Sequence, residues 1–297
     1  MWKYSSETDF TENQDENGFR YKARVDEHEV GQGSFRIAYK GKYVDSMRPG
    51  GPLVGSECVV KVFKEGYDND YKQWIPELKA HRRAVKMAKS FNQLQLSVSP
   101  RRTIRVLTPQ IARVHTRGSG TYLLATWNLF PVRNVCENEY VSIEPFLIGR
   151  WQKFNNNAAW YDESESAMLL QTFSHWTACK SRNKYLLCDL QGILRGNEYI
   201  LTDPCIHSWD EIHGLTDGGK DGMMTFLRGH RCNVICEELG LGKTLSVPYS
   251  PSSKFGCTCR SFQLTEELQR QNKEQKRKTL YPMDMLQEMK LDTIKNA

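Results

Sequence analysis

The sequence predicts an α+β fold of two lobes, because a strand-rich half is followed by a half in which helices and strands mix. β-Branched runs broken by glycine fill the first half, most clearly between Tyr21 and Phe63. After Glu144 the pattern changes to a polar loop, a helix and short strands. We therefore expect an N-terminal lobe over about 21–143, a C-terminal lobe over about 144–246, and a cleft between them.

The composition limits the class of protein. A chain of 297 residues that is 39% hydrophobic can form one large domain or two small ones, and it is too apolar for global disorder. The formal charge of +6 suits a phosphate-bearing ligand but is equally common in proteins that bind no anion. We therefore do not expect nucleic-acid binding as the main role.

Several features favour an intracellular, cytoplasmic location. The N-terminus, MWKYSSETDF, has no basic start and no apolar run, so it does not resemble a signal peptide. No stretch approaches the roughly eighteen apolar residues of a membrane-spanning helix. The nine cysteines are an odd number in a long chain, which favours buried, catalytic or metal-bound thiols in a reducing compartment.

The first half is predicted to start with a mobile polar tail over residues 1–20, followed by antiparallel strands around the tight turn GQGSF. Residues 71–94 predict a helix, with Pro76 in its first turn, where proline is tolerated. The helix has apolar residues at a helical period, namely Trp74, Leu78, Val85, Ala88 and Phe91. Further strands are expected in 103–116, 121–132 and 139–147.

The second half is predicted to run from a polar loop into a helix within 154–180, and then into strands within 184–194 and 198–203. The glycine-rich loop 213–222 leads into a single predicted helix over 222–239. Beyond it, 247–297 reads as a linker and a charged tail.

Lys61 lies in the apolar strand ECVVKVFK. A lysine there is either a surface residue on an edge strand or a charge held in a cleft. The glycine turn GQGSF lies one strand earlier. A nucleotide site combines these two features, because backbone amides close over phosphates and an ammonium group reaches them. A short glycine turn alone is also typical of an ordinary hairpin.

Two acidic residues end neighbouring strands. Asp189 follows YLLC, Gln191 shares its face because side chains alternate along a strand, and Asp203 ends YILTD. Two carboxylates and an amide oxygen at one edge suit Mg²⁺ or the orientation of a hydroxyl group. The alternative is that both aspartates simply cap turns before Gly and Pro.

His230, Cys232 and Cys236 form an H-x-C-x₃-C motif. On a helix the two cysteines would share one face, and such ligands suit Zn²⁺. The alternative is two buried free thiols and an unrelated histidine. A zinc site needs a fourth ligand, and the residues leave five candidates open: His175, His207, His213, Cys257 and Cys259.

The order of these segments resembles the catalytic domain of the alpha-kinases, the family of the myosin heavy chain kinases, elongation-factor-2 kinase and the channel-kinases. The resemblance covers about residues 20–245. It is carried, in order, by GSFRIAYKG, CVVKVFK, a helix ending in SFN, IEPFLIGRWQKFNNN, TFSHWTA, LLCDLQGIL, YILTDPCIHS and FLRGHRCNVICEELGL. It implies a two-lobed, atypical protein-kinase-like fold with a structural zinc site.

The resemblance also implies roles for individual residues. Lys61 and Arg36 would contact the phosphates of ATP, and Glu144 would occupy the hinge position that meets adenine. Asp189 would be the catalytic aspartate, and Gln191 with Asp203 would bind magnesium. The zinc ligands would be His175, His230, Cys232 and Cys236, and the loop 214–219 would lie near the substrate.

The expected activity is therefore transfer of the γ-phosphate of Mg-ATP to Ser or Thr hydroxyls of a protein, including autophosphorylation. One alternative is a kinase-fold scaffold without turnover, because the segment from Asp189 to Asp203 is longer than the resemblance leads us to expect. Another is a zinc-dependent nucleic-acid module, which the scattered basic residues disfavour. Cys205 stands where a polar residue is expected, and 247–297 has no counterpart in the family.

Overall fold

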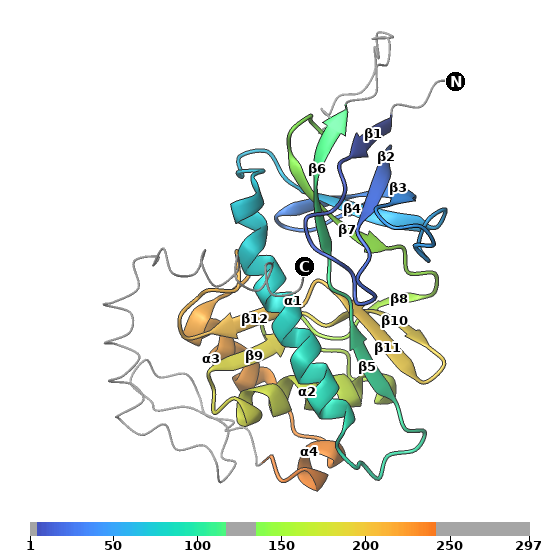
Figure 1. Cartoon of the computed structure of the whole chain (residues 1–297). Coiled ribbons are helices and arrows are strands. Elements are labelled where there is room, and N and C mark those ends of the chain that lie inside the picture. The colour runs from blue at the N-terminus through green and yellow to red at the C-terminus, as the bar shows by residue number, and fades with distance from the viewer. Residues whose placement is uncertain (1–4, 117–134, 242–297) are drawn as a thin grey trace, which may run out of the picture.

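The computed structural model describes residues 5–116 and 135–241 (Figure 1). It consists of a β-barrel and a second, mixed α and β part, as the α+β prediction requires. The predicted strand at 121–132 and the predicted linker and tail at 247–297 lie outside the described residues, as do Cys257 and Cys259. Within the described residues, no helix has the length and apolar character needed to cross a membrane.

The first part is a closed antiparallel barrel with the strand order β1-β2-β3-β4-β7-β6. Alternate side chains point inward, so Tyr39, Val60 and Ile143 are buried in its core. Closure gives each of these strands a neighbour on both sides. The strands are β1 (Ser5–Thr8), β2 (Tyr21–Gln32), β3 (Arg36–Ser46), β4 (Glu57–Phe63), β6 (Gln110–Thr116) and β7 (Tyr140–Pro145).

The prediction of a mobile tail over residues 1–20 is wrong for its described part. Strand β1 pairs with both β2 and β6 and so completes the barrel. Thr8 and Thr11 are buried, and their hydroxyls accept hydrogen bonds from the backbone N–H groups of Ala23 and Tyr21 at 3.0 and 3.2 Å. These polar side chains therefore form hydrogen bonds with backbone groups of the barrel instead of being exposed to solvent on a mobile tail.

Helix α1 (Tyr71–Asn92) confirms the helix predicted from residue 71. The side chain of Asp70 caps it by accepting a hydrogen bond from the N–H group of Gln73 at 3.1 Å. The prediction that Pro76 lies in the first turn is wrong. The helix begins at Tyr71, so Pro76 lies in its second turn. There it removes one backbone donor from the helix.

Among the described residues, the second part contains a four-stranded sheet, a two-stranded ribbon and three helices. The sheet has the order β5-β11-β10-β8, and β9 pairs with β12. These elements are β5 (Thr103–Val106), β8 (Trp151–Lys153), β9 (Tyr185–Cys188), β10 (Gln191–Arg195), β11 (Glu198–Thr202), β12 (Cys205–Ser208), α2 (Glu165–Lys180), α3 (Gly219–Gly229) and α4 (Val234–Glu238).

The structure does not divide the two lobes at a single point near residue 143. The start of α1 packs with the barrel side, where Trp74 lies 4.4 Å from Phe63 between ring centroids. The end of α1 packs with α2, where Phe91 lies 5.0 Å from Phe173. Strand β5 also joins the second lobe, because it pairs in parallel with β11. Helix α1 therefore runs along both parts (Figure 1).

The long segment from Asp189 to Asp203 folds as a tight β-hairpin. Strands β10 and β11 are antiparallel, and their last pair, Arg195 with Glu198, encloses a two-residue turn at Gly196 (φ 57°). At the other end Gln191 pairs with Thr202. The extra length is thus taken up far from the two aspartates.

The single helix predicted over 222–239 is divided into α3 and α4. His230 has extended backbone (φ −70°, ψ 128°) and ends α3. The side chain of Asn233 then starts α4 by accepting hydrogen bonds from the N–H groups of Ile235 and Cys236. Cys232 therefore lies in the connection and does not share a helical face with Cys236.

Candidate functional site

Lys61 is a buried charge at the centre of an ion network. From β4 its Nζ lies 2.6 Å from Asp203 Oδ2 and 2.9 Å from Glu144 Oε2, and it donates to Thr202 Oγ1 at 3.2 Å. Burial acts to lower the pKa of Lys61, but the charges of Asp203 and Glu144 outweigh it and raise this pKa above its ordinary value. Of the two readings open from the sequence, the structure supports a charge held between the lobes.

Asp203 joins this network to Arg36. Its Oδ1 lies 3.4 Å from Arg36 Nη1, while Oδ2 contacts Lys61. Burial alone would raise the pKa of Asp203, but the two cations hold it well below its ordinary value, so the carboxylate is ionised. Asp203 therefore links the cation from β4 and the cation from β3 through one ionised carboxylate.

Glu77 is a member of this site that the sequence reasoning missed. It lies on α1, is 4% exposed, and its Oε2 is 3.2 Å from Arg36 Nη1. Glu77 and Asp203 therefore both contact the same guanidinium nitrogen, Nη1 of Arg36. The signal was present in the sequence, because Glu77 falls beside Leu78 on the apolar face of the predicted helix, where an unpaired charge is costly.

Glu144 is expected at the hinge, but its side chain is buried within the ion network around Lys61. The side chain of Glu144 is 3% exposed. Oε2 contacts Lys61 and accepts a hydrogen bond from Thr202 Oγ1, and Oε1 lies 3.8 Å from His81 Nε2. The side chain is therefore engaged inside the protein.

Asp189 stands beside this network at the end of β9. Its Oδ1 lies 2.7 Å from Lys153 Nζ, and its Oδ2 accepts a hydrogen bond from Gln191 Nε2 at 3.5 Å. Burial raises the pKa of Asp189, and the Lys153 ammonium only partly offsets this. Lys153 was not predicted as a site residue; it is brought here because β8 pairs with β10, placing it opposite Gln191.

Both aspartates share an unusual backbone conformation. Asp189 and Asp203 have φ angles of 54° and 50°, in the left-handed region that Asp and Asn tolerate better than most residues. Among the described residues both carboxylates contact cationic side chains, so they do more than cap turns. The charge of Asp203 also contributes to raising the pKa of Asp189, which places the two carboxylates within one electrostatic site.

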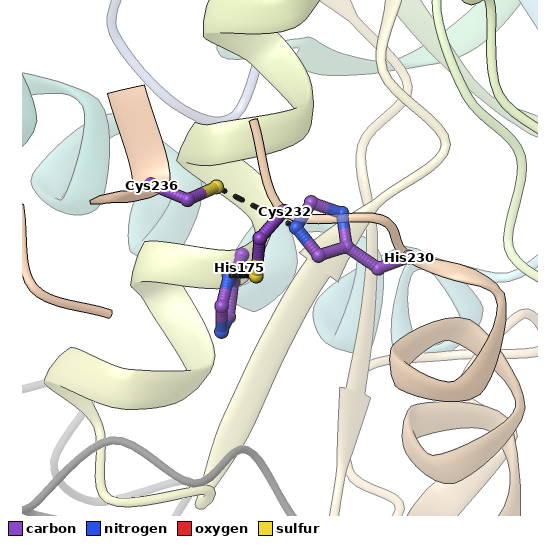
Figure 2. Close-up of side chains that lie close together, drawn as sticks. All are labelled: His175, His230, Cys232 and Cys236. Atoms are coloured by element: carbon purple, nitrogen blue, oxygen red, sulfur yellow. Dashed lines mark hydrogen bonds between the residues drawn. The ribbon is translucent and has the colours of Figure 1, made fainter. Parts of the chain in front are cut away.

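A second site gathers four metal-ligand side chains (Figure 2). His175 comes from α2, His230 and Cys232 from the connection after α3, and Cys236 from α4. One ligand atom of each lies within 4.8 Å of all the others. Cys236 Sγ is 3.5 Å from His230 Nε2, and Cys232 Sγ is 3.8 Å from His175 Nδ1.

The chemistry of these four residues fits zinc. Two imidazole nitrogens and two sulfurs form the donor set of a closed tetrahedral Zn²⁺ site. The hydrogen bond with Cys232 and then burial raise the pKa of Cys236 well above its ordinary value. Two thiols this close together, one of them buried, ionise readily only beside a cation, which zinc would supply.

His207 and His213, the other described candidates for the fourth ligand, have different partners. His207 Nε2 donates to the Asn157 carbonyl at 2.7 Å, and its Nδ1 accepts from the N–H group of Gly218 at 2.9 Å. His213 Nδ1 lies 2.9 Å from Ser208 Oγ. Both histidines therefore hold the glycine-rich loop against β12.

Cys205 occupies the position where a polar residue is expected. Its Sγ donates to the Thr216 carbonyl at 3.0 Å, so the thiol makes a hydrogen bond of the kind that a polar side chain would make there. It also lies opposite Cys188 in the β9–β12 pair, and the two sulfurs form a buried group with His207. Because both nitrogens of His207 already have partners, this group is a structural one.

Comparison with known proteins identifies the family. The alpha-kinase family model matches residues 31–236. The alpha-protein kinase vwkA of Dictyostelium discoideum is 33% identical over 213 residues, which is 70% of this chain and 30% of that protein. Myosin heavy chain kinase B of the same organism is 38% identical over 99 residues, 33% of this chain and 13% of that one. The chain belongs to the alpha-kinase family.

Solved structures show the same fold. A novel alpha kinase from Entamoeba histolytica has a TM-score of 0.60 at 21% identity and covers 86% of this chain and 98% of its own. The alpha-kinase domain of myosin-II heavy chain kinase A, solved in complex with AMP-PNP, has a TM-score of 0.58 at 20% identity, covering 82% and 98%. The chain thus spans nearly all of these solved domains but only a minor part of the curated relatives.

Proposed function

We propose that this protein is an ATP-dependent serine/threonine protein kinase that transfers the γ-phosphate of Mg-ATP to hydroxyls of a protein substrate and of its own chain. The observation that carries the proposal is the buried network in which Lys61 contacts Glu144 and Asp203 beside Asp189. Membership of the alpha-kinase family and the likeness to a domain bound to AMP-PNP support it.

In this proposal Lys61 and Arg36 bind the phosphates of ATP. Both cations now contact Asp203, at 2.6 and 3.4 Å. Phosphate oxygens would compete for these cations and satisfy their charge in the same way. Glu144 would keep Lys61 in place, and an adenine contact at this position would come from its backbone, because its carboxylate faces inward.

Gln191 and Asp203 would hold the magnesium ion. Asp203 is ionised, and Gln191 uses its Nε2 group toward Asp189, which leaves its amide oxygen for a cation. When bound, magnesium would neutralise charge that develops on the transferred phosphoryl group. The protein's own contribution is to position these two oxygen donors at adjacent ends of β10 and β11.

Asp189 would align the acceptor hydroxyl and accept its proton. Burial raises its pKa and so makes it a better proton acceptor than an exposed carboxylate. Lys153 at 2.7 Å would fix the direction of the carboxylate and limit that rise. Phosphoryl transfer needs little more than such positioning together with charge neutralisation.

Zinc would be structural in this proposal. Four protein ligands, His175, His230, Cys232 and Cys236, would complete its coordination and leave no position for water. It would connect α2 to α4 and to the segment after α3. A cytoplasmic location forms part of the proposal, because an odd number of cysteines in a long chain favours buried, catalytic or metal-bound thiols in a reducing compartment.

The test is transfer of labelled γ-phosphate from Mg-ATP to the protein itself and to a generic basic protein, for wild type and Asp189→Asn. Asn is the matched change because it also tolerates the positive φ at this position. We expect label on Ser or Thr for wild type and at least about 100-fold less for the variant. A folded wild type that transfers no label would contradict the proposal and favour the scaffold alternative, for which the tight hairpin after Asp189 gives no structural motive.

A further inference from the structure

His81 lies behind the Lys61 network on α1 and is 1% exposed. Its Nδ1 is 2.8 Å from the backbone carbonyl of Glu77. A carbonyl oxygen only accepts hydrogen bonds, so Nδ1 carries a hydrogen and donates it. This fixes the ring and turns Nε2 toward Glu144, whose Oε1 lies 3.8 Å away.

The two atoms that face each other, His81 Nε2 and Glu144 Oε1, are buried and have no hydrogen-bond partner among the described residues. The other carboxylate oxygen of Glu144 is engaged by Lys61 and Thr202. Leaving a buried carboxylate oxygen and an imidazole nitrogen unsatisfied is costly. A short movement that brings Nε2 within hydrogen-bonding distance of Oε1 would satisfy both atoms.

We propose that His81 is a positioning residue for ATP binding, which acts by holding Glu144 and, through it, Lys61. The proposal rests on the function proposed above. When nucleotide and magnesium bind, Asp203 and Lys61 are drawn toward them, and Glu144, together with Thr202, remains to hold Lys61 in the protein. The contact between His81 on α1 and Glu144 then determines whether Glu144 keeps its position beside Lys61.

A metal ion is the alternative occupant of this place, because His81, Glu144 and Asp203 each offer a ligand atom within 4.8 Å of the others. The Lys61 ammonium argues against it. Its Nζ already lies 2.9 Å from Glu144 and 2.6 Å from Asp203, so a cation bound there would meet a positive charge. The geometry therefore favours a hydrogen-bonding role for His81.

Two substitutions separate the two nitrogens of His81. The amide nitrogen of Gln stands near the position of Nε2, so His81→Gln keeps a donor toward Glu144. The amide nitrogen of Asn stands near that of Nδ1, so His81→Asn keeps only the link to the Glu77 carbonyl. We expect His81→Asn to raise the KM for ATP and the Kd for Mg-AMP-PNP about tenfold with a smaller change in kcat, and His81→Gln to stay within about threefold of wild type.

A purely structural role predicts a different outcome. Equal losses in both variants, or a harmless His81→Asn, would overturn the proposal. If wild type binds Mg-AMP-PNP normally, such a result counts against His81 alone; if wild type binds no nucleotide, the proposed function and this inference fail together. Should His81→Asn not fold, ¹⁵N NMR of the wild-type ring decides: we expect the Nε2 resonance of His81 to shift on addition of Mg-AMP-PNP, and an unchanged resonance would overturn the proposal.

Discussion

Lys153 Nζ lies 2.7 Å from Asp189 Oδ1, so a half-exposed lysine on β8 neutralises a largely buried carboxylate at the end of β9. The lysine and the aspartate are far apart in the sequence and meet because β8 pairs with β10, which begins two residues after Asp189. This contact opposes the rise that burial imposes on the pKa of Asp189.

Replacing Lys153 should therefore change the pH dependence of phosphate transfer. In Lys153→Met the pKa of Asp189 rises further. As the pH falls, the carboxylate therefore becomes protonated, and can no longer accept a proton, at a higher pH than in wild type. We expect the acid limb of the kcat/KM profile to move to higher pH and activity near neutrality to fall about tenfold. Lys153→Arg is the control and should keep the wild-type profile; a Met variant with an unmoved acid limb would rule out this role of Lys153.

Asp203 should make stability depend on pH in the acid range. Its folded-state pKa lies below the unfolded value, so its contribution is fully present above about pH 4 and is lost as the pH falls toward the folded pKa. In Asp203→Asn the Tm should be lower near neutrality and should decrease less between about pH 4 and pH 2. Thermal melts of wild type and variant across that range test this, and parallel curves would contradict it.

Removing zinc should unfold the second lobe. We expect about one zinc per chain by metal analysis, and loss of near-UV circular dichroism with a lower Tm after treatment with a strong chelator. Cys236→Ser should lose the metal in the same way. Cys188→Ser removes another buried thiol outside the four-residue set and should keep it; a wild type without zinc but with an unchanged Tm would exclude the structural role.

Gly192 should be irreplaceable, because its φ is 152° and a Cβ atom there would collide with the backbone carbonyl oxygen of Ile200. Gly192→Ala is expected to lower the free energy of unfolding by about 3 kcal/mol or more. Gly33→Ala is the matched control, since a Cβ at Gly33 meets no atom within 4 Å. Denaturant unfolding of both variants compares them, and equal stabilities would refute the expected clash.

The sequence predicted the main elements where local periodicity is strong. Helix α1, the strand of Lys61 and the strands before the two aspartates lie where alternation or a helical period placed them. The site residues Lys61, Arg36, Glu144, Asp189, Gln191 and Asp203 also lie near one another, as the family resemblance implied, although their roles remain proposals. Local patterns of this kind are set by the chain itself.

The predictions that failed depend on contacts between distant segments. Polar residues 5–20 look like a tail until β6 and β2 supply partners for β1. The break before α4 depends on Asn233, whose side chain caps α4 and is itself held by hydrogen bonds with Thr172 and Met168 of α2. Lys153 and His81 could be recognised only after strand pairing and helix packing had brought them beside Asp189 and Glu144.

Because α1 packs in both cores, the two lobes cannot be separated at a single position in the sequence. A fragment ending near residue 143 would expose Ala84, Ala88 and Phe91, and β5 would lose its partner β11. A chimaera that combines the barrel of this chain with the second lobe of a relative would face a mismatched helix. Such an exchange has to transfer residues 80–106 together with the second lobe. The segments that must be exchanged together are therefore not contiguous in the sequence.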